Sequence, residues 1–294
     1  MTYRSIFRPG LFANQRIIVT GGGSGIGRCT AHELASLGAH VALVGRTMDK
    51  LQAVAKEIAA AGGIEPSCHA CDIRVPAQVA QTIAEVLSSG SPIAALVNNA
   101  GGQFPSPLKD ITPNGFDAVV RNNMTGGFLM ARECFRASME ANGGAIVNIL
   151  ADMWHSMPGM GHSGAARAGM LNLTMTAAVE WAYAGVRVNA VAPGWIASSG
   201  LKAYPPDMKA KFQHQQGYVP LKRFGTESEV SAAIVFLLSE AASFISGSCL
   251  RVDGAAPNAR FDWDMPDHHR SRPYRGFELE TELDFITPLN DAAS

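Results

Sequence analysis

Short apolar runs alternate with longer helical segments along most of this chain, and this alternation limits the fold more than any other feature. The apolar runs lie at residues 16–20, 40–44, 67–71, 93–97, 145–150, 187–192 and 248–252. Segments with helical spacing lie at 26–37, 49–61, 76–87, about 114–139, 164–184 and 227–238. Strands that are apolar throughout need cover on both faces. The pattern therefore predicts an α/β fold, a doubly wound, mostly parallel sheet of about seven strands.

Two regions fall outside this pattern. Residues 195–225 hold scattered Pro, Gly and Ser with weak periodicity, which is typical of a lid over a substrate site. Residues 255–294 also lack periodicity, and we expect an arm over the same or a neighbouring subunit, with a disordered tail as the alternative. We thus expect an N-terminal arm (1–14), a single domain (15–254) and a C-terminal arm (255–294).

The composition excludes several classes of protein. A formal net charge of −1 supplies no basic excess for a nucleic-acid partner. No apolar run reaches the roughly 18–20 residues of a membrane helix, and residues 1–14 lack the apolar core of a secretory signal. We expect a cytoplasmic protein that acts on a small molecule, without nucleic-acid or membrane partners.

The five cysteines suggest neither disulfides nor a metal site. Cys68 and Cys71 form a C-x-x-C pair, but no second pair and no histidine cluster accompanies it. We interpret them as two small apolar side chains near a strand end, and expect no metal.

A glycine-rich turn, T-G-G-G-S-G-I-G at residues 20–27, joins the first predicted strand to the first predicted helix. A pyrophosphate bound at a helix N-terminus must approach backbone N–H groups, which excludes side chains and favours glycine. The position of this turn, after a strand and before a helix, is the context that gives the motif its meaning. It predicts a Rossmann-type dinucleotide site.

The end of the second strand bears on the choice of dinucleotide. An NAD-binding site usually has an Asp or Glu there for the ribose 2′-hydroxyl, but this chain has Val44, Gly45 and Arg46. Arg46 can bind a 2′-phosphate through two hydrogen bonds, so NADP(H) is favoured over NAD(H). In the alternative interpretation, Arg46 is a solvated residue that stacks on adenine.

Several further motifs follow in a fixed order. Residues 98–101 read N-N-A-G, residues 71–73 read C-D-I, residues 123–126 read N-M-T-G and residues 187–194 read R-V-N-A-V-A-P-G. Together with the glycine turn they resemble the short-chain dehydrogenase/reductase family across about residues 14–254.

The resemblance implies which residues bind the coenzyme. Those expected near adenosine and pyrophosphate are Gly21, Ser24, Gly25, Ile26, Gly27, Arg46, Asp72, Asn99, Ala100 and Gly101. Those expected near the nicotinamide are Arg167, Pro193, Gly194, Ile196 and Ser198.

The catalytic residues of the family are mostly replaced. The resemblance aligns Ser163 with the family's tyrosine and Arg167 with its lysine. The family's serine falls at Leu150 or Ala151, so that only Asn123 of the usual set is kept. A guanidinium can donate hydrogen bonds to a ribose but stays protonated and relays no proton readily.

Residues 162–169 and 99–104 are similar to the trans-2-enoyl-CoA reductase branch of the family, and residues 265–268 extend the similarity. Related dienoyl-CoA reductases also have a serine in the tyrosine position. The enoyl branch has a tyrosine and a lysine where this chain has Leu171 and Met175, so the proton donor lies elsewhere. The candidates before the helix are Asp152, His155 and His162. His162 can titrate near neutral pH, and a structural hydrogen bond is its alternative role.

These replacements favour one reaction over others. Alcohol oxidation requires a base, whereas reduction of a carbon–carbon double bond beside a carbonyl requires only enolate stabilisation and a later proton. We expect an NADPH-dependent reductase of an enoyl-CoA or related unsaturated carbonyl. The alternatives are a dehydrogenase of an allylic or terpenoid alcohol, and a catalytically silent dinucleotide-binding protein. The resemblance also implies a homodimer or homotetramer formed through helices 114–139 and 164–184.

Overall fold

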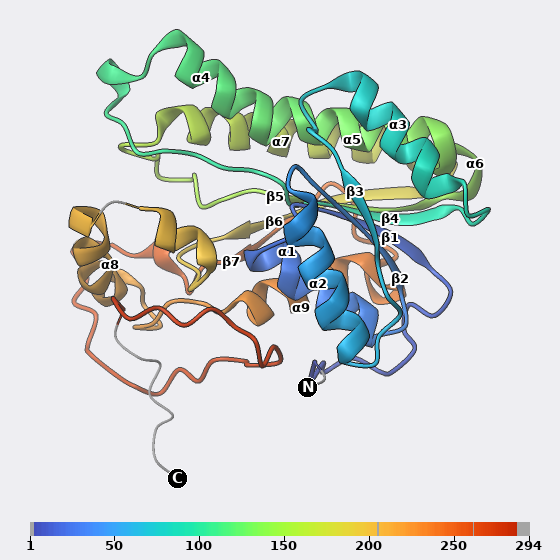
Figure 1. Ribbon diagram of the computed structural model, residues 1–294. Helices are drawn as coiled ribbons and strands as arrows, with labels where there is room; N and C mark the ends of the chain where they lie inside the picture. Colours follow the sequence, from blue (N-terminus) through green and yellow to red (C-terminus); the bar gives the residue numbers. More distant parts are fainter. Residues whose placement is uncertain (1–2, 205, 261, 287–294) are drawn as a thin grey trace.

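The computed structural model describes residues 3–204, 206–260 and 262–286. Its centre is a sheet of seven strands in the order β3-β2-β1-β4-β5-β6-β7 (Figure 1). The strands are β1 (Arg16–Thr20), β2 (His40–Gly45), β3 (Ser67–Ala70), β4 (Ile93–Asn98), β5 (Gly144–Ile149), β6 (Val186–Pro193) and β7 (Cys249–Val252). Every neighbouring pair is parallel. The predicted fold class, strand number and single domain are confirmed.

Helices cover both faces of the sheet (Figure 1). One face carries α1 (Gly25–Ser36), α2 (Met48–Ala60) and α9 (Glu227–Leu238), and the other carries α3 (Pro76–Leu87), α5 (Gly126–Cys134) and α7 (Gly161–Glu180). Successive residues of β1 supply both cores, because strand side chains alternate between faces. Ile17 and Val19 pack in the core on the α1 side, and Ile18 packs in the core on the α5 side. All three are 0% exposed, which explains why the strand is apolar throughout.

The predicted helix at 114–139 is a longer helical column with two wider turns. It consists of α4 (Pro113–Val120), a π-helical turn (Arg121–Thr125), α5, a second π-helical turn (Phe135–Met139) and α6 (Glu140–Asn142). Such turns are often found at functional sites. The first one holds Asn123 with its side chain buried.

The order of the strands fixes the place of the site. The chain winds outward from β1 through β2 to β3, and then from β4 to β7 on the other side. Loops that follow β1 and β4 therefore leave in opposite directions, and a crevice opens between them at the carboxyl ends of the strands.

The lid contains a helix that the sequence pattern did not predict. Helix α8 (Pro206–Tyr218) occupies 13 residues of the segment 195–225, where the weak periodicity predicted no helix. Among the described side chains of α8, Phe212 alone is buried. A helix with one buried apolar residue produces no apolar stripe in the sequence. Phe212 packs with Leu201 and Phe224 in a small separate core.

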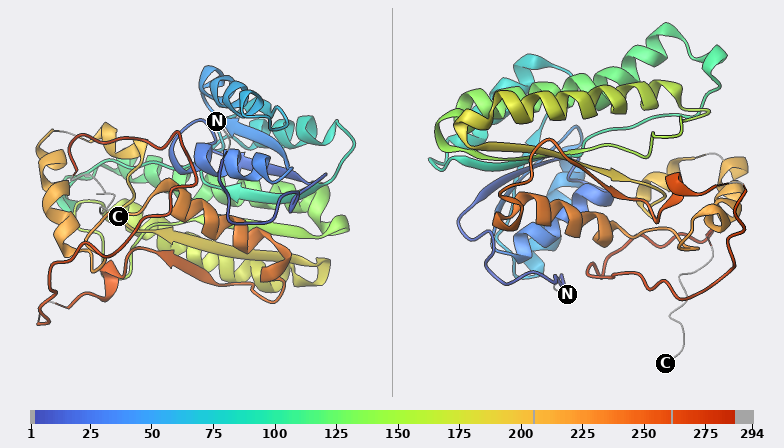
Figure 2. Two further views of the ribbon diagram at one scale, coloured as in Figure 1. Left: turned by 90° about the horizontal axis from the view of Figure 1, so that it is seen from below. Right: turned by 180° about the vertical axis from the view of Figure 1, so that it is seen from behind.

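The described part of the C-terminal arm lies against its own chain. Figures 1 and 2 show this orange-to-red segment on the outside of the domain, running past α8 and α9. Phe277 stacks on Tyr3 with ring centroids 5.9 Å apart, and the Arg28 guanidinium lies 5.1 Å from the Phe277 ring. Further along, Leu283 and Ile286 complete the small core of the lid. The arm thus connects the α1 face with the lid.

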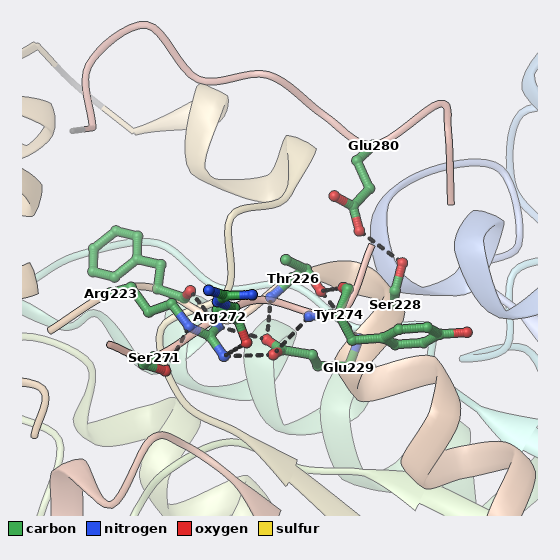
Figure 3. Close-up of polar contacts among 9 residues, drawn as sticks. Arg223, Thr226, Ser228, Glu229, Ser271, Arg272, Tyr274 and Glu280 are labelled. Carbon is green, nitrogen blue, oxygen red and sulfur yellow. Dashed lines mark hydrogen bonds and ion pairs between the residues drawn. The ribbon is translucent and has the colours of Figure 1, made fainter. Parts of the chain in front are cut away.

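A cluster of polar contacts anchors the arm to the start of α9 (Figure 3). Arg223 forms a two-point ion pair with Glu229, with N–O distances of 2.6 and 2.8 Å. Its guanidinium also donates to the Ser271 hydroxyl at 2.9 Å. Thr226 and Glu229 cap α9 reciprocally, and the Thr226 hydroxyl donates to the backbone oxygen of Tyr274 at 2.7 Å. The ion pair therefore fixes both the helix end and the arm.

The structure also bears on the cysteines, on metals and on membrane spans. All five cysteines are unpaired thiols, including Cys68 and Cys71. Among the described residues, no group of three His, Cys, Asp or Glu side chains could hold a metal ion. Within the same residues, no helix is both long and apolar enough to cross a membrane.

Candidate active site

A cavity of about 650 Å³ opens at the carboxyl ends of the strands, where the crevice was expected. Its wall includes nearly all of the predicted coenzyme residues: Gly21, Ser24, Gly25, Ile26, Arg46, Asp72, Asn99, Ala100, Gly101, Arg167, Pro193, Gly194, Ile196 and Ser198. Gly27 is buried beneath this wall. The cavity is therefore an elongated site that crosses β2, β1, β4, β5 and β6.

The glycine turn is shaped so that only glycine fits. Gly21 and Gly25 have φ angles of +66° and +57°, which side-chain-bearing residues rarely adopt. A Cβ atom on Gly27 would lie 2.4 Å from the backbone oxygen of Gly21. The Thr20 hydroxyl accepts the backbone N–H groups of Asn99 and Ala100 at 3.0 and 2.9 Å, which ties the turn to the end of β4. The resulting hollow at the N-terminus of α1 fits a pyrophosphate.

The end of the cavity that lies next to β2 is basic. Arg46, which is exposed, and Lys50 of α2 both line it. Asp72 forms an ion pair with Arg74 at 2.6 Å. Hydrogen bonds from Arg74, with a smaller contribution from the charge of Arg46, lower the pKa of Asp72 to about 2. The Asp72 carboxylate is thus already paired, while the two cations Arg46 and Lys50 line this end of the cavity.

Arg167 lies at the centre of the cavity wall although it is only 8% exposed. One guanidinium nitrogen donates to the backbone oxygen of Ile149 at the end of β5. Burial lowers the pKa of Arg167 to about 10, so the group remains charged at neutral pH. A Cβ atom on Gly101 would lie 2.8 Å from its Nη2 and 2.6 Å from Oδ1 of Asn123, so a larger residue there would displace these side chains. Arg167 can therefore donate hydrogen bonds to a ligand in the cavity.

Asn123 supports the cavity from behind. Its side-chain nitrogen donates to the backbone oxygens of Gly102 and Val119 at 2.7 and 2.8 Å. Its side-chain oxygen accepts the N–H of Gly102 at 3.1 Å. These bonds hold the loop after β4 to the π-helical turn.

Ser163 and His162 lie behind the cavity wall, and both are 0% exposed. The Ser163 hydroxyl donates to the side-chain oxygen of Gln103. The Nδ1 atom of His162 accepts the backbone N–H of Ser163 at 2.9 Å, and its buried Nε2 has no partner among the described residues. The His162 ring meets the Phe104 ring at 89°, with centroids 4.6 Å apart. Neither side chain borders the cavity.

Asp152 and His155 also lie outside the cavity wall. The backbone N–H of Asp152 donates to the backbone oxygen of Pro193 at 3.1 Å. Burial raises the pKa of the Asp152 carboxyl, and the nearby Asp253 raises it further. His155 is exposed.

The structure adds three side chains that the sequence analysis did not assign. Lys50 lies near Arg46, because α2 follows β2 after a short turn. Gln103 follows the N-N-A-G motif, and Tyr204 belongs to the lid. The N-N-A-G motif could have indicated that Gln103 lies near the site, whereas no local sequence pattern indicates Tyr204.

Comparison with known proteins agrees with this geometry. A family model described as enoyl-(acyl carrier protein) reductase matches residues 21–255. A Bacillus subtilis (strain 168) protein named "probable 2,4-dienoyl-CoA reductase" is 37% identical over 241 residues, which cover 81% of this chain and 94% of that protein. The peroxisomal 2,4-dienoyl-CoA reductase of Mus musculus is 34% identical over 259 residues, with coverages of 86% and 87%.

A solved structure from Pseudomonas aeruginosa PAO1, a citronellol catabolism dehydrogenase, is 61% identical with a TM-score of 0.78. The alignment covers 86% of this chain and 99% of that protein. The solved structure shares the fold, and all of these matches extend across nearly the whole domain. The chain therefore belongs to the short-chain dehydrogenase/reductase family and is an NAD(P)-dependent oxidoreductase.

Proposed function

We propose that this protein reduces the carbon–carbon double bond of an α,β-unsaturated acyl thioester or a related unsaturated carbonyl compound, using NADPH. One observation carries the proposal. The resemblance aligns Ser163 with the family's catalytic tyrosine, and Ser163 is 0% exposed with its hydroxyl bonded to Gln103. A base for alcohol oxidation is therefore missing at that position. Double-bond reduction needs no base, because the substrate accepts a proton after it accepts hydride.

The preference for NADPH rests on Arg46 and Lys50. Two cations at the adenosine end favour a 2′-phosphate, and no carboxylate follows β2 to accept a 2′-hydroxyl. The glycine turn would hold the pyrophosphate, and Pro193, Gly194, Ile196 and Ser198 would hold the nicotinamide. When bound, the reduced nicotinamide supplies a hydride.

The remaining steps belong to the chain's own residues. Arg167 would hold the nicotinamide ribose, and it keeps its charge because its lowered pKa is still about 10. Asn123 would keep the loop at Gly102 in place, so that the substrate carbonyl meets a rigid wall. The polar groups of this wall would stabilise the enolate that forms after the β-carbon accepts hydride.

A substrate panel tests the proposal. Purified protein is mixed with NADPH and trans-2-enoyl-CoA esters of several chain lengths, together with 2,4-dienoyl-CoA esters, and absorbance at the NADPH band is followed. We expect turnover of at least one thioester and formation of the reduced product. Tight NADPH binding without turnover of any unsaturated carbonyl compound would instead indicate a silent dinucleotide-binding protein.

A second candidate is oxidation of an acyclic terpenoid alcohol. It is favoured by the 61% identity to the citronellol catabolism dehydrogenase. The same assay with NADP⁺ and citronellol or geraniol separates the two reactions. For this candidate His162 or Asp152 would have to act as the base, and neither side chain lines the cavity. If His162 is the base, His162→Gln would abolish alcohol oxidation without changing coenzyme affinity.

We also propose a homodimer or homotetramer that uses the long helices. The outer face of α7 leaves Met175 and Val179 exposed, at 43% and 78%, and Tyr183 follows at 73%. Such an apolar surface on one helix favours contact with another subunit. Light scattering coupled to gel filtration measures the mass of the assembly.

A further inference from the structure

A tyrosine lines the cavity from the lid rather than from α7. Tyr204 follows the short helical turn Ser199–Ala203 and shares the cavity wall with Gln103 and Arg167. A tyrosine hydroxyl beside the coenzyme is the group that the family uses to exchange a proton, but here it comes from a different element of the fold. The neighbours of the Tyr204 hydroxyl determine whether it can donate a proton.

A chain of two hydrogen bonds orients the Tyr204 hydroxyl. Ser163 donates to the side-chain oxygen of Gln103, which leaves the Gln103 nitrogen facing the lid. That nitrogen donates to the Tyr204 hydroxyl oxygen at 3.3 Å. An amide nitrogen has hydrogens but accepts none. The Tyr204 oxygen is therefore an acceptor in this bond, and its own hydrogen remains available.

The hydrogen of Tyr204 has only a weak partner within the protein. The hydroxyl lies 3.8 Å from the thioether sulfur of Met160, and thioether sulfur is a weak acceptor. A substrate in the cavity can replace this contact at little cost. A hydrogen bond received from Gln103 also stabilises the phenolate that remains after proton loss.

Aromatic packing holds the Tyr204 ring. It meets Phe212 of α8 at 89°, with centroids 5.5 Å apart, and Phe212 is 0% exposed. Phe212 in turn contacts Trp195 and, at 6.0 Å, Phe285 of the C-terminal arm. The position of the hydroxyl therefore depends on the lid and the arm together.

We propose that Tyr204 is the proton donor of the reductase, an assignment that rests on the proposed double-bond reduction. After the β-carbon of the substrate accepts hydride, the electron pair of the double bond resides on an enolate. The O–H bond of Tyr204 breaks, a C–H bond forms at the carbon next to the carbonyl, and the enolate charge moves to the phenolate oxygen. A proton from water then restores the phenol. Ser163 and Gln103 are positioning residues that act through Tyr204.

The test compares two matched substitutions on the lid. Tyr204→Phe removes the proposed donor, and Tyr218→Phe removes a hydroxyl that bonds only to His214 among the described residues, at 3.1 Å. With trans-2-octenoyl-CoA as substrate we expect Tyr204→Phe to lower kcat by about 10²–10⁴-fold. We expect the Tm of this variant and its Kd for NADPH to equal those of the wild type. Tyr218→Phe is expected to keep wild-type kcat.

A labelling measurement separates proton donation from support of the lid. In D₂O, the wild type should place one deuterium at the carbon next to the carbonyl on a single face. The residual product of Tyr204→Phe should be a mixture of molecules with the deuterium on one face or on the other, because water then protonates the enolate. A Ser163→Ala variant should lower kcat by a smaller factor, about 3–30-fold, and keep one face.

Two results would overturn the assignment. One is a Tyr204→Phe enzyme with kcat within threefold of the wild type, and the other is a slow variant that still labels a single face. Failure of the proposed function gives a different result, because the wild type itself would then reduce no unsaturated thioester.

Discussion

Glu227 gives the protein a pH dependence whose sign and size follow from its surroundings. Glu227 begins α9, is 1% exposed and lies beside the glycine turn, with its Oε1 3.9 Å from the place of a Cβ on Gly25. The Thr281 hydroxyl of the arm donates to it at 3.4 Å, as does the backbone of Ser199. Burial raises its pKa from 4.5 to about 7, and the charge of Glu280 contributes to the increase.

The raised pKa means that the folded protein holds a proton more tightly than the unfolded chain. Below pH 4.5 both states are protonated, and the group has no effect on stability. Between pH 4.5 and 7 the unfolded chain ionises first, so the free energy of unfolding falls as the pH rises. Above pH 7 the free energy of unfolding falls no further on account of this group. The difference between the two pKa values corresponds to a total loss of about 3 kcal/mol.

Glu227→Gln removes this loss, because the amide is uncharged and keeps an oxygen that accepts the Ser199 N–H. In urea unfolding at pH 8 we expect the variant to be more stable than the wild type by about 3 kcal/mol, and at pH 5 by about 1 kcal/mol or less. Glu282→Gln, an exposed residue of the same arm, serves as the control and should change neither value. The reasoning is refuted if the gain is equal at both pH values, or if the variant is less stable at pH 8.

Three further substitutions test other parts of the structure. Arg46→Ala should weaken NADPH binding by about 10–100-fold with little effect on NADH binding, since a hydrogen bond to a charged group contributes about 1.5–3 kcal/mol. Fluorescence titration measures both affinities. An equal loss for both coenzymes would contradict a role of Arg46 in selecting the phosphorylated coenzyme. Gly27→Ala places a Cβ 2.4 Å from the backbone oxygen of Gly21, so it should weaken binding of both coenzymes alike, and unchanged affinity would show that the turn adapts. Phe277→Ala removes a side chain that is 3% exposed and stacks on Tyr3; urea unfolding should show a loss of about 3 kcal/mol, and a loss below about 1 kcal/mol would mean that the arm contributes little to stability.

The sheet, most of the helices and the glycine turn that lines the cavity could be predicted from the order of the amino acids. These features depend on short segments, since a buried strand such as residues 16–20 must be apolar and a pyrophosphate turn must be glycine. The sequence also showed that none of the three residues after β2 is an Asp or a Glu. The resemblance also implies that Ser163 and Arg167 align with the family's tyrosine and lysine, because motifs lie on either side of them in the sequence.

The surroundings of Ser163 and Arg167, in contrast, could be seen only in the folded chain. The hydrogen bond between Ser163 and Gln103 joins residues 60 positions apart, and the bond between Gln103 and Tyr204 joins residues 101 positions apart. No local sequence pattern encodes contacts over such separations. Helix α8 was missed for the opposite reason, because its burial depends on a distant arm rather than on a stripe of its own. Glu227 has its raised pKa only because the lid and the arm exclude water from it. Short sequence patterns encode local structure, whereas the burial of a side chain and its contacts with distant residues exist only once the chain has folded.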